Sequence, residues 1–273
     1  MKSSKLTKYF VFSLLFCICL TLSAAGQTKL FWQIGKADNN TAEFALGPNN
    51  SNQYSVTFPR DALFIAGQSD PKQDWPYIQP GPADTWAGST SHTFTILFGV
   101  KTAPTTGQCE LLIDFVDTHS AKPPRMQIKI NESSFIRELP KGAGDPSAFG
   151  EVEKGREHLL TIDFPVQVLE AGTNTITITS LTGSWILYDY LTLRTPAGVE
   201  TGPLKSTNKL LGIDTQPFLI ERNGELYQPV IASLLHLGEP VEATVTVKGS
   251  EPVKQLLKSG YKMIEGFAPQ VTK

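Results

Sequence analysis

The sequence predicts an all-β protein, namely a jelly-roll β-sandwich followed by a partial second β domain. Three observations predict it. Apolar and polar residues alternate with a period of two along most of the chain, which is the pattern of half-buried strands. No stretch of comparable length shows a 3.6-residue period. Turn residues separate many short runs, as in sandwiches and jelly rolls.

The alternation places individual strands in order. Residues 93–100, for example, direct Phe94, Ile96 and Phe98 toward one face, while threonines occupy part of the other. Trp32 and Trp185 are expected in the core. Strands of the first domain are expected at residues 41–46, 54–58, 93–100, 110–116, 126–130, 159–164, 173–180 and 184–193.

The N-terminus has the layout of a secretory signal peptide, assigned to residues 1–26. Lysines precede an apolar run at 9–22, and small residues follow at 23–26. The run is about 14 residues long, too short to span a bilayer comfortably, although a retained anchor is the alternative. Cleavage after Ala25 or Gly26 is expected. The protein is therefore predicted to be exported, to the periplasm or to the extracellular or cell surface.

Composition limits the possible partners. Residues 27–273 are mildly acidic, so charge gives no reason to expect nucleic-acid binding. This part of the chain keeps one cysteine, Cys109, which cannot form an internal disulfide. The exported fold must therefore depend on its hydrophobic core, to which 12 of the 15 phenylalanines of the sequence can contribute.

The jelly-roll domain is assigned to residues 27–194. Its longest connection, residues 131–156, is either a crossover between the two sheets or a functional loop. A Gly- and Pro-containing linker is expected at 195–209.

A partial β domain is assigned to residues 210–273. Strands are expected at 217–221, 226–237 and 241–247, with Asn223-Gly224 as a hairpin turn. The last segment, 253–267, is expected to begin with a short helix. Roughly 65 residues of strands make a poor independent domain. We therefore expect a truncated unit of a longer protein, with a downstream partner domain missing.

Catalytic motifs are missing from the sequence. It contains no nucleophile elbow, phosphate-binding loop or dinucleotide fingerprint, and none of its histidines is spaced as a metal ligand with another histidine or cysteine. No catalytic residue is therefore predicted. The histidines are His92, His119, His158 and His236.

The aromatic loop at residues 74–86 is the candidate carbohydrate site. Trp75, Tyr77 and Trp86 could stack on sugar C–H faces, while Asp74, Gln79 and Asp84 could form hydrogen bonds with the sugar hydroxyls. Prolines and a glycine in the loop break both helix and strand. The alternative is that the rings pack onto the sheet.

Two carboxylates form a candidate metal pair. Asp189 falls on the apolar face of the last strand, and Glu43 lies in the expected strand 41–46. If the first and last strands are neighbours, the pair could share a structural calcium ion, which prefers oxygen ligands. In the alternative, Asp189 accepts hydrogen bonds from backbone or tyrosine donors.

Two segments carry a family resemblance. Residues 31–38 with 42–44, and residues 184–193, resemble the opening and closing strands of the third, carbohydrate-binding-like domain of family 4 polysaccharide lyases, the rhamnogalacturonan lyases. The resemblance covers about residues 30–194. Similar modules occur near the N-terminus of multidomain glycan-degrading proteins of gut Bacteroidetes, ahead of a mannosidase-like region.

This resemblance implies a jelly roll of carbohydrate-binding-module type. The catalytic groups of the lyases lie on another domain, so none is transferred here. Related modules often hold calcium between terminal strands. The implied function is a non-catalytic module that binds a polysaccharide or oligosaccharide within an exported polysaccharide-degrading protein. Alternatives are the N-terminal fragment of a glycoside hydrolase or lyase whose catalytic domain lies downstream, and a purely structural spacer.

Overall fold

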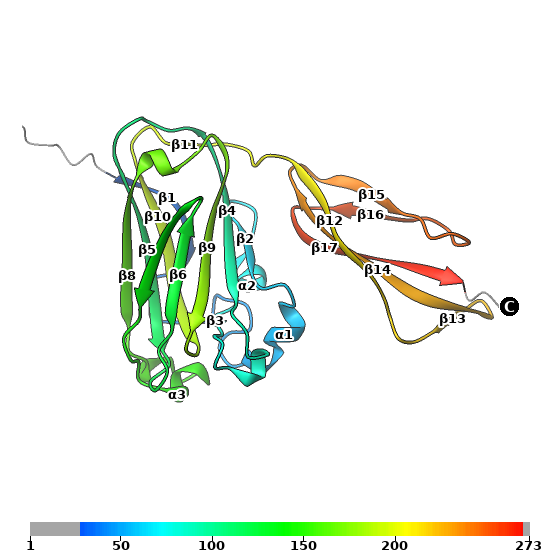
Figure 1. Cartoon of the computed structure of the whole chain (residues 1–273), viewed down its shortest axis with the longest axis horizontal. Coiled ribbons are helices and arrows are strands. Elements are labelled where there is room, and N and C mark those ends of the chain that lie inside the picture. The colour runs from blue at the N-terminus through cyan, green and yellow to red at the C-terminus, as the bar shows by residue number, and fades with distance from the viewer. Residues whose placement is uncertain (1–27, 270–273) are drawn as a thin grey trace, which may run out of the picture.

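The computed structural model describes residues 28–269, which form a β-sandwich followed by a smaller β unit (Figure 1). Helices in this part of the chain are short. None of those within residues 28–269 has the length and apolar character needed to cross a membrane.

The first sheet of the sandwich contains the two strands that the resemblance relies on. Its order is β1-β10-β5-β8, all antiparallel, and the short β3 also pairs with β10. The strands are β1 (Thr28–Gly35), β3 (Ile78–Gln79), β5 (Gln108–Thr118), β8 (His158–Pro165) and β10 (Ile186–Pro196). The opening strand is β1, and not the expected strand 41–46, and it pairs directly with the closing strand β10.

The second sheet packs against the first. Its order is β11-β4-β9-β6-β7, and β2 adds to β4 in parallel. The strands are β2 (Leu63–Ile65), β4 (Thr93–Thr102), β6 (Arg125–Ile130), β7 (Ser133–Glu138), β9 (Gly172–Thr182) and β11 (Glu200–Thr201). The predicted long connection 131–156 therefore contains a strand, β7, which forms a hairpin with β6.

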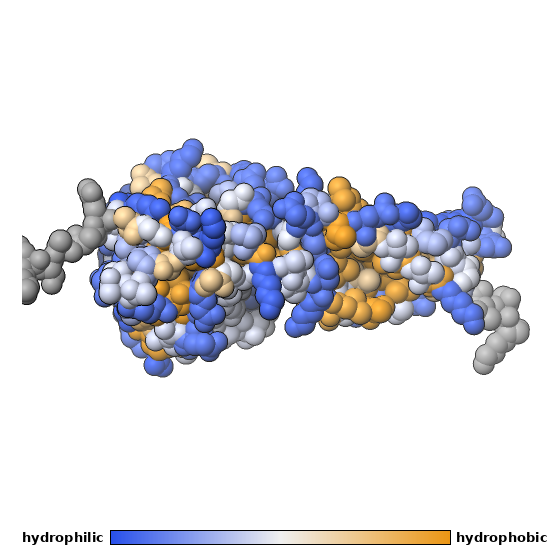
Figure 2. Space-filling model, turned by 90° about the horizontal axis from the view of Figure 1, so that it is seen from above, coloured by the Kyte–Doolittle hydropathy of each residue, from blue (hydrophilic) through white to orange (hydrophobic). Residues whose placement is uncertain are grey.

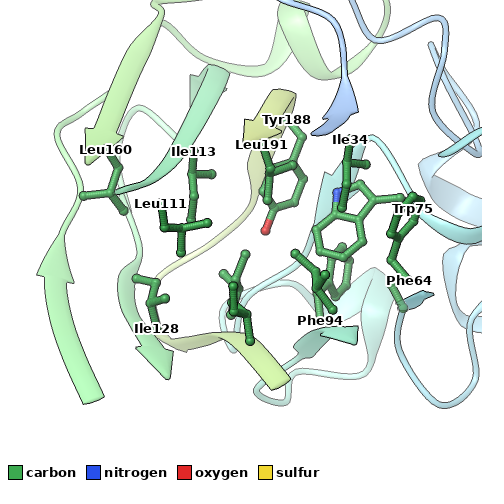
Figure 3. Packing of buried hydrophobic residues seen from close by; sticks show 14 of the residues in the cluster. Ile34, Phe64, Trp75, Phe94, Leu111, Ile113, Ile128, Leu160, Tyr188 and Leu191 are labelled. Atoms are coloured by element: carbon green, nitrogen blue, oxygen red, sulfur yellow. The ribbon is translucent and has the colours of Figure 1, made fainter. Parts of the chain in front are cut away.

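The core lies between these two sheets. The inward residues predicted for residues 93–100, Phe94, Ile96 and Phe98, are at most 1 % exposed. Trp32 and Trp185 are also buried, as predicted. Figure 3 shows side chains of both sheets meeting in this layer.

Cys109 on β5 is one of the core residues. Its thiol is free and fully buried, and burial raises its pKa to about 12. The sulfur therefore acts as a small apolar side chain.

Two expected strands are not strands. Residues Tyr54–Thr57 form the short helix α1, because Tyr54 and Phe58 are buried one helical turn apart while Val56 is 79 % exposed. Residues 41–46 form turns that bury Phe44 and end at Leu46 with a φ of 63°. In both segments, alternation over five or six residues was too short to exclude a helical turn.

Two further short helices lie in the connections of the sandwich. These are α2 (Pro71–Asp74) and α3 (Asp145–Ala148). α1 and α2 lie on the side of the sandwich that faces the second unit (Figure 1).

The second unit is a four-stranded antiparallel sheet with one additional hairpin. The predicted turn is confirmed, since Asn223 and Gly224 both have positive φ and join β13 to β14. The segment 253–267 forms strands and no helix, which corrects the expectation; Ile264 and Gly266 are buried at alternate positions. The strands are β12 (Thr207–Thr215), β13 (Ile220–Arg222), β14 (Glu225–Leu237), β15 (Val241–Val245), β16 (Val253–Leu257) and β17 (Gly260–Pro269).

A small apolar cluster joins the two units. Ile65 of β2 and Leu97 of β4 pack with Leu237 of β14. The segment between the units is also tied to the sandwich, because β11 pairs with β4. The apolar cluster thus holds the two units together on one side of their junction, and a cleft lies beside it.

Candidate carbohydrate-binding site

The structure places two rings of the aromatic loop inside the core. Trp75 and Tyr77 are both 0 % exposed. Trp75 meets Phe94 and Tyr188 edge-on, with ring centroids 5.1 and 5.4 Å apart (Figure 3). The Tyr77 hydroxyl donates to the Ala148 carbonyl at 2.7 Å. Neither ring can stack on a sugar in this structure, so the packed alternative holds for both, and Trp75 and Tyr77 are not binding residues here.

Trp86 has a different environment. It lies in a short 3₁₀ helix, η2 (Thr85–Ala87), and is 37 % exposed. Its ring meets the buried Tyr54 ring edge-on, with a centroid separation of 6.2 Å. Of the three predicted rings, Trp86 is therefore the one that a ligand can reach.

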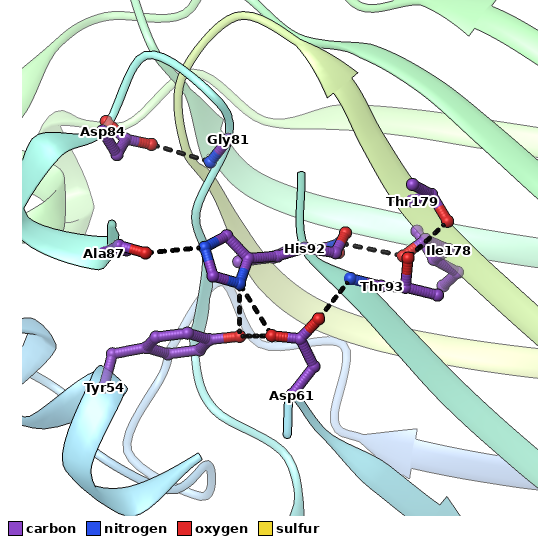
Figure 4. Close-up of polar contacts among 10 residues, drawn as sticks. Tyr54, Asp61, Gly81, Asp84, Ala87, His92, Thr93, Ile178 and Thr179 are labelled. Carbon is purple, nitrogen blue, oxygen red and sulfur yellow. Dashed lines mark hydrogen bonds and ion pairs between the residues drawn. The ribbon is translucent and has the colours of Figure 1, made fainter. Parts of the chain in front are cut away.

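The two aspartates of the loop are held by the fold. Asp84 is 5 % exposed and accepts hydrogen bonds from the Gly81 amide at 2.8 Å and from the Ser184 hydroxyl (Figure 4). Asp74 accepts from the Asp70 amide at 2.9 Å and lines the cleft between the units. Asp84 therefore shapes the loop, and Asp74 lies where a ligand could reach it.

A buried polar network supports the same end of the sandwich. Asp61 accepts from the Tyr54 hydroxyl at 2.9 Å and from the Thr93 amide at 2.7 Å, and its Oδ1 lies 2.7 Å from Nδ1 of His92 (Figure 4). Burial alone lowers the pKa of His92, but the hydrogen bond and charge of Asp61 outweigh it, so the pKa is raised. The network fixes the segment before β2 against β4.

The predicted metal pair binds the backbone. Asp189 is 1 % exposed and its Oδ1 accepts from the Asn40 amide at 3.0 Å, while Glu43 Oε1 accepts from the Lys36 amide at 2.9 Å. Both carboxylates thus hold the turn that follows β1. The alternative role named for Asp189 is the one observed.

The calcium site stays a prediction. Ca²⁺ takes six to eight oxygen ligands. Within residues 28–269, no group of three or more His, Cys, Asp or Glu side chains is arranged to hold a metal ion. Glu43 and Asp189 would therefore need further oxygens from carbonyls or water.

A β-bulge places Asp189 away from the core. Tyr188 pairs with Phe115 and Tyr190 with Asp114, so Asp189 has no partner on β5. The extra residue breaks the strict alternation expected for residues 184–193. It brings Asp189 near Asp114, and the two charges interact.

Asp114 makes stability depend on pH. Burial, with the charges of Asp189 and Glu157, raises the pKa of Asp114 from 3.8 to about 7. The folded state therefore binds this proton more tightly than the unfolded chain, and the resulting stabilisation is lost as pH rises through about 7. We expect the free energy of unfolding to fall by about 2 kcal/mol between pH 5 and pH 8.

Urea unfolding at both pH values measures this difference. The side chain of Asp114→Asn is neutral at both pH values, so this variant should show a smaller difference in unfolding free energy between them. The pKa values of Asp189 and His92 are also raised, so protonation of these groups likewise stabilises the fold less as pH rises. Some pH dependence should therefore remain in Asp114→Asn. An unchanged pH dependence in Asp114→Asn would show that Asp114 titrates normally.

Asp117 organises the connection between β7 and β8 and was not singled out from the sequence. It is fully buried and accepts from the amides of Thr118 and Ala143 at 2.9 and 2.8 Å and from the Ser147 hydroxyl at 2.6 Å. A Cβ at Gly142 would lie 1.8 Å from the Thr118 carbonyl oxygen, so the loop needs glycine there. Nothing in the local sequence indicates this long-range contact.

A cleft of about 660 Å³ separates the sandwich from the second unit. Its wall on the sandwich side includes the segment before β2 and the helix α2, and its other wall comes from β14 and β17 with the turns beside them. Domain junctions are common places for ligand sites, and the volume lies within the usual range for small-molecule pockets. The cleft-lining residues Arg60 and Tyr261 were not predicted.

Taken together, the two packed sheets and the cleft beside them define a β-sandwich with a pocket at its junction with a second β unit. A family model described as CBM-like, polysaccharide lyase family 4, domain III, matches residues 30–193. The match covers more than half of the chain, which therefore belongs to this family. The resemblance stated from β1 and β10 is thereby confirmed.

Solved structures give weaker likenesses. The CBM35 module of Abf62 from Cellvibrio japonicus is 14% identical with a TM-score of 0.27, over 42% of this chain and 73% of that one. Latent PorU from Porphyromonas gingivalis is 13% identical with a TM-score of 0.27. The match covers 38% of this chain and only 10% of PorU. A family GH115 4-O-methyl-α-glucuronidase is 16% identical with a TM-score of 0.26. The match covers 39% of this chain and 14% of the glucuronidase. No curated protein matches the chain.

Proposed function

We propose that this protein is a non-catalytic carbohydrate-binding module of an exported polysaccharide-degrading protein. The observation that carries the proposal is the family match over residues 30–193. The site supports a binding role, because the buried acidic groups Asp84 and Asp117 are bonded within the fold and Asp61 is bonded to Tyr54, Thr93 and His92. Side chains used in this way hold structure and are poorly placed to transfer protons to a substrate.

Affinity electrophoresis tests the binding role. The full chain is run through native gels that contain one polysaccharide each, from a pectin and mannan panel, beside a non-binding reference protein. We expect retardation in at least one gel, with a Kd on the order of micromolar to millimolar. Unchanged mobility relative to the reference in every gel would contradict the proposal.

The parent protein is part of the same proposal. The matching model represents one domain of a polysaccharide lyase, which favours a catalytic domain elsewhere in the parent protein, either a lyase or a glycoside hydrolase. The second unit also exposes apolar side chains that an adjoining domain could cover (Figure 2). Examples are Leu210, Ile213 and Phe218, which are 59 %, 62 % and 53 % exposed. An adjoining reading frame without a catalytic domain would contradict this part.

Export is proposed on the signal-peptide pattern of residues 1–26, which lie outside the described residues. We expect the secreted or periplasmic protein to begin after Ala25 or Gly26. Mass spectrometry of the N-terminal peptide would show this, and a retained N-terminus in a cytoplasmic fraction would contradict it.

A further inference from the structure

The cleft between the units contains cationic groups that the fold does not use. Arg60 comes from the sandwich, and Lys258 and Lys262 come from the turn and strand of the second unit. Among residues 28–269, no carboxylate lies within 4.0 Å of these three cations, although five other ion pairs occur there. The three charges are therefore available to a ligand.

The carboxylates of the cleft are less available. Asp61 is occupied by Tyr54, His92 and Thr93, and Asp74 accepts from the Asp70 amide. Glu239 is the remaining acidic side chain of the lining, and it is exposed. Among the described residues, the cleft thus has three cationic side chains without an ion-pair partner, and one carboxylate, that of Glu239, without a hydrogen-bonded partner.

One aromatic ring of the lining is open to solvent. Tyr261 is the second residue of β17 and is 40 % exposed, and it lines the cleft. Arg60 and Asp61 of the sandwich line the same cleft as Tyr261. Burial raises the pKa of Tyr261, Arg60 lowers it and Asp61 raises it. A ring and a guanidinium from different units thus line the same cleft.

We propose that this cleft binds the acidic sugars of a glycan, with Arg60 and Lys262 holding sugar carboxylates and Tyr261 lying against a sugar face. A planar guanidinium suits a carboxylate, and a tyrosine ring suits a sugar C–H face. The inference rests on the proposed glycan-binding function and adds the location and the charge of the ligand. It also makes the second β unit half of the site.

Isothermal titration of the full chain tests the proposal. The probes are oligomers of glucuronic, galacturonic and mannuronic acid, each paired with its carboxyl-reduced form, in which a neutral hydroxymethyl group replaces each carboxylate. We expect at least one acidic oligomer to bind about tenfold more tightly than its reduced partner at low salt. The difference should shrink in 1 M NaCl, because exposed charges are then screened within about 3 Å.

Variants locate the binding. Arg60→Gln combined with Lys262→Gln should bind the acidic oligomer as weakly as its reduced partner. The matched control removes two exposed lysines outside the cleft lining, one on each unit, as Lys29→Gln with Lys209→Gln. It should bind like the unaltered chain. Tyr261→Ala should weaken the acidic and reduced oligomers alike, whereas Tyr261→Phe should retain stacking.

The outcomes separate this inference from the proposed function. If the cleft variants bind like the unaltered chain, or if no acidic oligomer binds more tightly than its reduced form, the cleft inference is wrong. Loss of binding in Trp86→Ala or Phe149→Ala alone would move the site to the exposed rings at the end of the sandwich. If no glycan binds the unaltered chain in the gels or in titration, both proposals fail.

Discussion

Trp75→Ala is expected to lower the free energy of unfolding by about 4 kcal/mol, because it removes the largest fully buried side chain from the sandwich. The indole touches three rings, those of Phe64, Phe94 and Tyr188. Their contacts bridge the two sheets, so the cavity cannot close without moving a strand. Urea unfolding followed by far-ultraviolet circular dichroism measures the change.

Two other variants make this result specific. Trp75→Phe should lower the free energy of unfolding less than Trp75→Ala. A phenylalanine keeps a ring in the cavity, and no hydrogen bond is lost because the buried indole nitrogen has no partner within residues 28–269. Trp86→Ala should cost under about 1 kcal/mol, because the ring is partly exposed and loses mainly its edge contact with Tyr54. Equal stability of Trp75→Ala and the unaltered chain would contradict the burial of Trp75.

Asp117→Ala is expected to have an effect of similar size, about 4 kcal/mol. It leaves the amides of Thr118, Ala143 and Gly144 without their shared acceptor, while the Ser147 hydroxyl keeps the Gly144 carbonyl. Buried donors without a partner are costly because they have also lost their hydrogen bonds to water. The connection between β7 and β8 should loosen together with the global loss of stability.

Limited trypsin digestion detects that local loosening. Lys141 is exposed in the same loop, and we expect faster cleavage after it in Asp117→Ala under native conditions. Asp145→Ala is the matched control, since Asp145 is exposed and close in sequence. Its stability should change by under about 1 kcal/mol. Unchanged cleavage at Lys141 in Asp117→Ala would show that Asp117 does not hold the loop.

The sequence predicted the strands of the sandwich because a long alternation of apolar and polar residues fits a strand and conflicts with a helical period. Residues 93–100 and 173–180 each show several apolar positions on one face, and they became the central strands β4 and β9. Alternation failed where it was short, as at Tyr54–Thr57, and where a bulge shifted the register at Asp189. Both errors come from local geometry that a period of two does not encode.

The candidate site was less predictable than the fold. A Pro-rich loop with large rings can face either way, and the choice for Trp75 depends on a space left between Phe64, Phe94 and Tyr188. The cleft requires Arg60 and Tyr261 to line one space from two different units. Residues so distant in sequence carry no shared pattern, and their meeting depends on the junction at Ile65 and Leu237.

The burial of Cys109 has a consequence for the surroundings in which the protein can work. A structure without a disulfide among its described residues loses no cross-link when thiols are reduced. A thiol with a pKa of about 12 is hardly ionised at neutral pH, so oxidants and mixed disulfides attack it slowly. The sandwich is thus indifferent to the redox state of its medium, and the same fold can persist in an aerobic or an anaerobic habitat.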